Sequence, residues 1–326
     1  LACLVGYSFT PKPFLVVFSS TSLGFVLTVV VAFVYFNCIV SWVLPLLSFN
    51  LSAILCFGQK TYLQNLQRAL FEKELEMTSV VQESMLPEKV SDDNIASIYQ
   101  PASRCSGDWF AIMRSKDNRL CLVIADATGH GAPAALVTAM CHTSVHNSFK
   151  LLDEIDSLSA ANLLWEINNK LCYPRENIAT LTMTVALIDE ERGVVEFSSA
   201  GHPPSYHLRQ NKVKMINSPG NILGMFTDEP FSNKQVSLEP GDTLVLYSDG
   251  LIENKDKDGK LISRPSLRKI LRNKANNGSV QSLGESFTEQ LQRHNQDVKF
   301  IEDDVTMIFY RYEPASLPAA SLEQAS

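Results

Sequence analysis

Residues 123–136 read VIADATGHGAPAAL, an apolar run that ends at Asp126 and leads into a loop containing two glycines. The apolar run begins at Leu120 and has the length of a buried strand, while Ala132 to Phe149 has the composition of a helix. A carboxylate at a strand end is held rigidly, and neighbouring glycines let the backbone turn sharply or approach an ion. The stretch therefore predicts a strand, a functional loop and a helix in succession.

Aspartates at three other places share this arrangement, because each one ends or follows a strand-like apolar run. They are Asp108 after Ser106-Gly107, Asp249 before Gly250, and the pair Asp303-Asp304. A single Asp-Gly is most simply an ordinary turn, but four such places in one domain indicate a shared cleft. Carboxylates that converge without a basic partner repel one another and require cations. Hard oxygen ligands suit Mg²⁺ or Mn²⁺, so the set predicts a metal site.

The rest of the region after residue 95 is expected to mix short strands with a second helix at Ser159–Cys172. Thr180–Ile188 and Val194–Ser198 alternate in polarity and are joined by a hairpin loop at 189–193. Further strands are expected at 204–208, 213–217, 234–238, 243–248 and 305–312. Strands linked by hairpins form antiparallel sheets rather than repeated βαβ units, which predicts an α+β fold.

Charge is distributed unevenly along the 326 residues, whose formal net charge is −7. Residues 1–58 contain one lysine and no acid, so the remaining part is acidic. An acidic domain argues against nucleic acid as a partner, because a phosphate track needs a basic face. The seven cysteines form no C-x-x-C pair, which argues against a zinc cluster or a disulfide framework.

The uncharged stretch between Lys12 and Lys60 predicts a transmembrane segment over residues 1–57, with helices at 14–36 and 38–57. A bilayer core needs about 20 apolar residues per helix, and Asn37 and Pro45 interrupt the run. The alternative is a buried pair of core helices. Basic residues follow the second span, which predicts a multi-pass protein of the inner (plasma) membrane with a cytoplasmic C-terminal part. Since the chain starts at Leu1 without a basic leader, we expect a truncation rather than a signal peptide.

Residues 58–86 predict a helical linker that Pro87 ends, since 59–86 contain neither Gly nor Pro. Two readings of this linker remain open: a coiled coil that makes a homodimer through residues 59–86, and a single amphipathic helix packed on the next domain. The tail 314–326 is rich in Ala and Ser and predicts disorder. The apolar seam of the linker is interrupted by Lys73 and consists of Leu63, Leu66, Leu70, Met77 and Val80.

Five motifs follow one another in order: SGDWF, VIADATGHGAPAAL, SAGHPP, LVLYSDGLIEN and DDVTMIF. With these motifs, residues 87–313 resemble the PPM family of metal-dependent serine/threonine phosphatases, in its bacterial SpoIIE- and RsbU-like branch. The resemblance implies a central sandwich of two antiparallel β-sheets flanked by helices (αββα), placed after the transmembrane helices and the linker.

The resemblance also implies roles for the aspartates. Asp126 would bridge two cations, Mn²⁺ or Mg²⁺, and the carbonyl of Ala127 would touch one of them. Asp249 and Asp303 would hold the second ion, and Asp108 would contact an ion or a metal-bound water. Asp304 is expected to have a supporting role, because the family often has Asn there.

Two histidines lie within the motifs, His130 and His202. Each could act as an acid for the leaving group, but we favour a role in which each supports the surrounding loop. His142 and His146 lack the glutamate of a zinc-protease motif and are expected on an ordinary helix face. Ala111 stands where the family often has an acid, so an outer carboxylate is expected to be missing.

The expected activity follows from the ions, since two cations that share a water supply hydroxide for in-line attack on phosphorus. The substrate implied by the resemblance is phosphoserine or phosphothreonine in a regulatory protein such as an anti-sigma-factor antagonist. One alternative is a catalytically silent receptor or scaffold, which Ala111 favours and the aspartates disfavour. Another is a nucleotide-using enzyme, but no P-loop lysine follows Gly129-His130-Gly131.

Overall fold

The computed structural model describes residues 22–31, 33–34, 43–87, 92–129, 131–172, 180–228, 230–255, 258–274, 279–294 and 301–314. The chain divides into two compact units, Leu1–Lys73 and Glu74–Ser326. The second unit begins inside the predicted linker, and it contains both sheets and all of the aspartates introduced above. The predicted tail lies outside the described residues from 315 onward.

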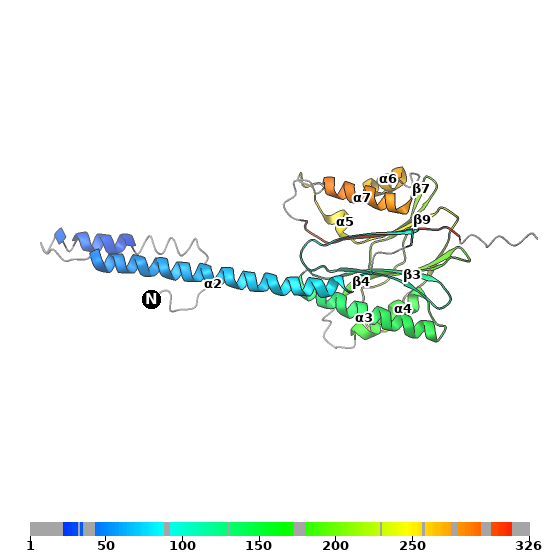
Figure 1. Ribbon diagram of the computed structural model, residues 1–326, viewed down its shortest axis with the longest axis horizontal. Helices are drawn as coiled ribbons and strands as arrows, with labels where there is room; N and C mark the ends of the chain where they lie inside the picture. The colour runs from blue at the N-terminus through cyan, green and yellow to red at the C-terminus, as the bar shows by residue number, and fades with distance from the viewer. Residues whose placement is uncertain are drawn as a thin grey trace, which may run out of the picture. The chain divides into compact units, whose positions relative to one another are not determined.

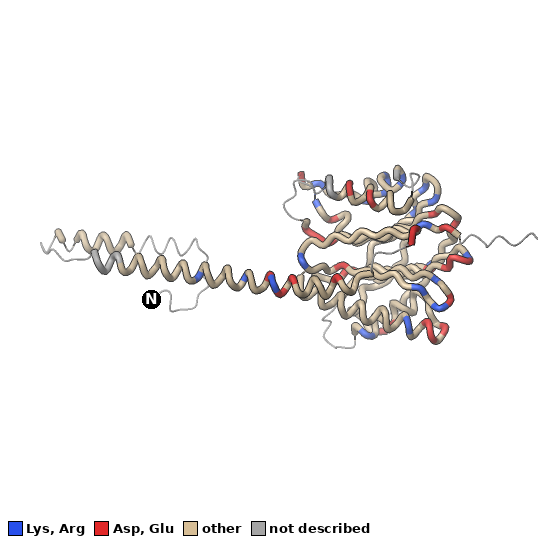
Figure 2. Tube along the Cα trace, viewed as in Figure 1, with Lys and Arg blue, Asp and Glu red and all other residues tan. Residues whose placement is uncertain are grey.

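A single helix, α2 (Val43–Glu83), covers much of the predicted second span and most of the predicted linker (Figure 1). Pro45 lies in its first turn, where the N–H that proline lacks would have no helical partner, so this proline is compatible with the start of the helix. The sequence of α2 contains no charged residue before Lys60, and Figure 2 shows charged residues along the part of this helix nearer its C-terminal end. The apolar residues of the seam are exposed along this helix.

The two predicted membrane spans lie partly outside the described residues, which lack 14–21, 32 and 35–42. Within the residues that the structure does describe, none of the helices combines the length and the apolar character that crossing a membrane requires.

Within the part of the chain that the structure describes, ten strands form two antiparallel sheets of five strands each, as the hairpin pattern predicted. The first sheet, sheet A, has the order β1-β10-β9-β6-β7, and the second, sheet B, has the order β2-β3-β4-β5-β8. The bounds are β1 Ile95–Gln100, β2 Asp108–Arg114, β3 Leu120–Ala127, β4 Leu181–Asp189, β5 Val194–Ala200, β6 Ser205–Arg209, β7 Lys212–Ile216, β8 Lys234–Ser237, β9 Thr243–Tyr247 and β10 Val305–Arg311.

Helices cover the outer face of each sheet, so the layers follow the predicted αββα order (Figure 1). Helices α3 (Ala132–Glu154) and α4 (Ala160–Cys172) pack on sheet B. Helices α6 (Arg264–Lys274) and α7 (Val280–His294) pack on sheet A, and the short helix α5 (Gly250–Glu253) follows β9. The α+β sandwich is therefore confirmed, although the sequence had indicated only α3 and α4 among these helices.

Strand β3 shows why the central strands are apolar throughout. Val123 and Ala125 contribute to the core under the helices of sheet B, whereas Leu122 and Ile124 contribute to the core between the two sheets. Successive side chains of a strand point to opposite faces, so a strand buried on both faces needs a continuous apolar run. Asp126, two residues after Ile124, consequently faces the space between the sheets.

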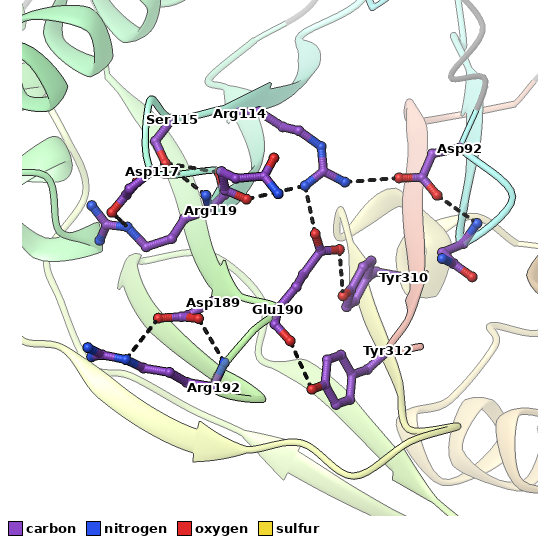
Figure 3. Close-up of polar contacts among 12 residues, drawn as sticks. Asp92, Arg114, Ser115, Asp117, Arg119, Asp189, Glu190, Arg192, Tyr310 and Tyr312 are labelled. Carbon is purple, nitrogen blue, oxygen red and sulfur yellow. Dashed lines mark hydrogen bonds and ion pairs between the residues drawn. The ribbon is translucent and has the colours of Figure 1, made fainter. Parts of the chain in front are cut away.

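The sheets are also joined by a polar cluster at the end of β2 that is opposite to Asp108 (Figure 3). Arg114 contacts Asp92 at 3.1 Å and Glu190 at 2.7 Å. Glu190 lies in the loop between β4 and β5 of sheet B, and its carboxylate accepts a hydrogen bond of 3.0 Å from Tyr310 of sheet A. Tyr312 donates to the backbone carbonyl of Glu190 at 2.9 Å. The cluster, defined here as the Arg114–Glu190 cluster, therefore holds β10 against sheet B.

Candidate active site

Sheet B places Asp108 and Asp126 side by side at one of its ends. Asp108 is the first residue of β2, Asp126 is the penultimate residue of β3, and the two are direct partners in the antiparallel register. Paired residues of neighbouring strands point to the same face. Both carboxylates thus lie on the face that looks toward sheet A.

Sheet A brings Asp249 and Asp303 to the same place. Asp249 follows the end of β9 and Asp303 precedes the start of β10, and these two strands are antiparallel neighbours. The two sheets are connected here by Ser248, whose Oγ donates to Asp108 Oδ2 at 2.6 Å. One carboxylate oxygen each from Asp249, Asp303 and Glu253 lies within 4.8 Å of the others.

Burial and mutual repulsion make this group of carboxylates unfavourable without a cation. Burial raises the pKa of Asp126 to about 8, and the nearby charges of Asp249 and Asp303 add to the rise. Burial also raises the pKa of Asp108 well above its ordinary value, with the charge of Asp126 as the next cause. The pKa of Asp303 rises as well, first through burial. A divalent cation would reverse these shifts, because it stabilises the ionised carboxylates.

The residue Gly107 shows that the site also fits the oxygen ligands of such a cation. A Cβ at this position would lie 2.8 Å from the carbonyl oxygen of Ala127, 3.2 Å from that of Gly129 and 3.3 Å from Asp126 Oδ1. These oxygens therefore converge on a space that only glycine leaves open. Backbone and carboxylate oxygens are the ligands that Mg²⁺ and Mn²⁺ prefer.

Asp304 holds the turn that carries Asp108. Its Oδ1 accepts a hydrogen bond from Ala102 N and its Oδ2 accepts one from Gly107 N, both at 2.6 Å. Two backbone donors occupy the two carboxylate oxygens, so this side chain orients the loop before β2. The supporting role expected for Asp304 stays a prediction.

His202 is buried, and its Nδ1 lies 2.7 Å from the hydroxyl of Thr182, which is the register partner of Asp126. Burial lowers the pKa of His202 to about 3. The ring is therefore neutral near pH 7 and fits a supporting role rather than that of a charged acid. His130, the other histidine singled out by the sequence, lies outside the described residues.

A carboxylate at position 111 would not belong to this group of aspartates. Ala111 is 2% exposed and packs in the core between sheet B and its helices, on the face of β2 opposite to Asp108. His142 and His146 lie on α3, where their rings pack on each other and on Trp109. These residues are part of the scaffold behind the aspartates.

Three further residues of the candidate site, Ser248, Glu253 and Asn254, are not among those predicted from the sequence, although they belong to the same SDGLIEN segment as Asp249. The spacing between Asp249 and Glu253 could have indicated Glu253, because residues four apart on a helical turn lie on the same side. Ser248 and Asn254 act through hydrogen bonds between distant segments, which the sequence alone does not show.

The site and the fold agree with the comparison to known families. The family described as "Stage II sporulation protein E (SpoIIE)" matches residues 116–313, more than half of the chain. The chain belongs to the SpoIIE family. The SpoIIE- and RsbU-like resemblance predicted from the motifs is thereby confirmed.

Relatives of this SpoIIE-family chain include the phosphoserine phosphatase RsbU of Bacillus subtilis (strain 168), which is 27% identical over 79% of this chain and 75% of its own length. The phosphoserine phosphatase RsbP of the same organism is 27% identical over 56% of this chain but only 46% of its own length. Among solved structures, the SiaA-PP2C domain of Pseudomonas aeruginosa has a TM-score of 0.67 at 20% identity, and the match covers 76% of this chain and 99% of that one. The PP2C phosphatase domain of Bacillus subtilis SpoIIE has a TM-score of 0.54 at 19% identity, over 69% of this chain and 64% of that one. At these identities the structural matches show the shared fold.

Proposed function

We propose that this SpoIIE-family protein hydrolyses phosphoserine or phosphothreonine in a regulatory protein with the help of two divalent cations, Mn²⁺ or Mg²⁺. The observation that carries the proposal is the convergence of Asp108 and Asp126 from sheet B with Asp249 and Asp303 from sheet A. The names of the relatives RsbU and RsbP support the reaction.

Each aspartate has a place that suits a role at the cations. Asp126 is the direct partner of Asp108 and is also close enough to Asp249 and Asp303 to raise its pKa, so it suits a bridging ligand. The carbonyl of Ala127 faces the same space. Asp249 and Asp303 would hold the second cation together. The cations, when bound, lower the pKa of a shared water and offset charge on the phosphoryl oxygens.

The substrate that we propose is a phosphorylated anti-sigma-factor antagonist. The support is the family resemblance and the similarity to RsbU over 75% of its length. An acidic domain suits a protein substrate better than a nucleic acid, because nucleic-acid binding needs a basic face.

Anchoring in the plasma membrane, with the phosphatase domain in the cytoplasm, is a further part of the proposal. Its support is the absence of charged residues between Lys12 and Lys60 and the basic residues that follow. Fractionation of cells that express the full chain tests it: recovery of the protein in the soluble fraction would contradict anchoring.

A direct assay tests the phosphatase proposal. The full chain is purified and supplied with a phosphoserine or a phosphothreonine peptide, and released phosphate is measured with Mn²⁺ and with a chelator. We expect release only with the cation. A catalytically silent receptor would instead release the same small amount of phosphate as its Asp126→Asn variant.

A further inference from the structure

Asn254 is a buried amide that directly follows α5, and its side chain is fully engaged by hydrogen bonds. Its Nδ2 donates to the carbonyl oxygen of Gly250 at 2.8 Å and to that of Asp303 at 2.7 Å. Its Oδ1 accepts from the backbone N–H of Glu302 at 2.8 Å and from that of Asp303 at 2.9 Å. One side chain thus connects the turn after Asp249 to the segment before β10.

The two connected segments leave little space between them. A Cβ on Gly250 would lie only 2.0 Å from the carbonyl oxygen of Asp304, so the backbone at 250 is packed directly against the backbone at 303–304. Asp249 immediately precedes this contact, and Asp303 immediately precedes Asp304. The hydrogen bonds of Asn254 therefore fix the spacing between the carboxylates of Asp249 and Asp303.

The chemistry of the position calls for an amide. An amide donates twice and accepts twice without adding charge, whereas an aspartate would only accept and would add a negative charge next to Asp249, Glu253 and Asp303. A serine could donate to the carbonyl of Gly250, four residues earlier, but it is too short to bridge to Glu302 and Asp303.

We propose that Asn254 is a positioning residue that sets the separation of the Asp249 and Asp303 carboxylates for a divalent cation. This inference rests on the cation site of the proposed function, because the spacing matters only if both carboxylates hold the same ion. Groups that orient metal ligands typically change metal affinity by about 10- to 100-fold when they are removed.

The decisive variant is Asn254→Ser, which can keep the local hydrogen bond to Gly250 and loses those to Glu302 and Asp303. The matched control is Asn168→Ala. Asn168 is also a buried amide, on α4, and it donates to Phe226 O at 2.7 Å and accepts from Gly224 N at 2.9 Å. Both variants remove hydrogen bonds of a buried amide, but only Asn254 contacts the segment at Asp303.

Mn²⁺ binding is measured on the full chain from the free-ion signal in electron paramagnetic resonance. We expect Asn254→Ser to weaken Mn²⁺ binding about tenfold or more, and phosphate release at saturating Mn²⁺ to change much less. Asn168→Ala is expected to keep the Mn²⁺ affinity of the wild type. Equal Mn²⁺ affinity in the wild type and in Asn254→Ser would overturn the inference, and so would an equal loss in both variants.

A second readout needs no metal and guards against a misfolded variant. In metal-free protein, amide hydrogen exchange of residues 301–305 is expected to be faster in Asn254→Ser than in the wild type and unchanged in Asn168→Ala. Unchanged exchange in Asn254→Ser overturns the inference while the phosphatase proposal stands. Absence of both Mn²⁺ binding and phosphate release in the wild type would overturn the proposed function and this inference together.

Discussion

The side-chain amide of Gln82 pairs with the backbone of Ser106 in both directions. Gln82 Nε2 donates to Ser106 O at 2.6 Å, and Ser106 N donates to Gln82 Oε1 at 3.0 Å. Nε2 also lies 2.9 Å from the hydroxyl of Thr138 on α3. Gln82 belongs to the last turn of α2, and Ser106 immediately precedes Gly107 and Asp108. The end of α2 is therefore connected by hydrogen bonds to the turn that carries Asp108, an aspartate of the candidate active site.

Replacing Gln82 with Ala should lower both stability and turnover. The change leaves the buried N–H and carbonyl of Ser106 without this partner, which costs about 1–3 kcal/mol, and it frees the turn before Asp108 to move. Urea unfolding measures the first effect and phosphate release with Mn²⁺ measures the second. Gln281→Ala is the control, because Gln281 donates to Asp93 O at the surface, away from the aspartates. If the Gln82→Ala variant had the same turnover as the control variant, the contact of α2 with Ser106 would have no effect on the active site.

Asp126→Asn and Asp249→Asn should each reduce turnover by at least about a hundredfold, because each change removes a charge that holds a cation. Asp156→Asn, at an exposed position after α3, should retain full turnover. Phosphate release and circular dichroism are measured on the same samples. A folded Asp126→Asn protein with undiminished turnover would refute the metal-dependent mechanism.

Ala111→Asp should destabilise the domain by about 3 kcal/mol or more rather than raise its activity, because it places a carboxylate in the core between sheet B and its helices. Leu136→Asp provides the comparison, since Leu136 is 65% exposed on α3. Thermal unfolding separates the two variants. A gain of activity in Ala111→Asp would mean that this position does reach the cations.

Asp242 should make stability depend on acid pH. Although burial alone would raise its pKa, hydrogen bonds from Arg209, from the backbone at Glu239 and from His207 outweigh that effect and lower it. An unfolded aspartate has a pKa near 3.9, so the stabilisation is present above about pH 4 and is lost as the pH falls through the lower folded value. Urea unfolding between pH 6 and pH 3 should show a smaller decrease in Asp242→Asn than in the wild type. If the free energy of unfolding decreased equally in both proteins over this pH range, Asp242 would not be the cause of the acid dependence.

A homodimer through residues 59–86 is one of the two readings of the linker, and Lys73→Leu tests it. The change should strengthen pairing of two chains through α2, along the exposed seam of Leu63, Leu66, Leu70, Met77 and Val80. Replacing an ammonium with an apolar side chain in the seam is worth about 1–2 kcal/mol. Sedimentation of the detergent-solubilised full chain measures the dimer fraction, and Lys60→Leu, outside the seam, is the control. If the dimer fraction did not change, the seam of α2 would not pair two chains, and the helix would only connect the two parts of one chain.

Most of the strands, though not β1 and β2, could be predicted together with the aspartates, because both leave local marks in the sequence. A strand buried on two faces is a continuous apolar run. Strand β3 carries Asp126 near its end, three residues before Gly129, and β9 leads into Asp249, which Gly250 follows. Helices α6 and α7 were missed although Val280, Leu283, Phe287 and Leu291 recur at helical spacing, because polar residues outnumber these four. The apolar residues of these helices are buried against sheet A, and a local sequence pattern does not show this packing between distant segments.

The positions of the aspartates could be predicted, but the hydrogen bonds that orient them could not. The motifs point to Asp108, Asp249 and Asp303, yet Asn254 connects to a residue 49 positions away and Ser248 to one 140 positions away. Such pairs depend on the register of the sheets and on how the sandwich closes. A single sequence shows which residue types are present, but it does not show which distant residues they bind by hydrogen bonds.

The Arg114–Glu190 cluster has a consequence for how this domain can change state. It joins the two sheets at one end of β2, and the hydrogen bond from Ser248 to Asp108 joins them at the other end. Sheets that are fastened at both ends of the same strand cannot shear past each other or open like a hinge without breaking the buried hydrogen bond from Ser248 to Asp108 or the partly exposed contacts of the Arg114–Glu190 cluster. Switching between active and inactive forms should therefore involve short displacements of individual loops around a sandwich that stays rigid.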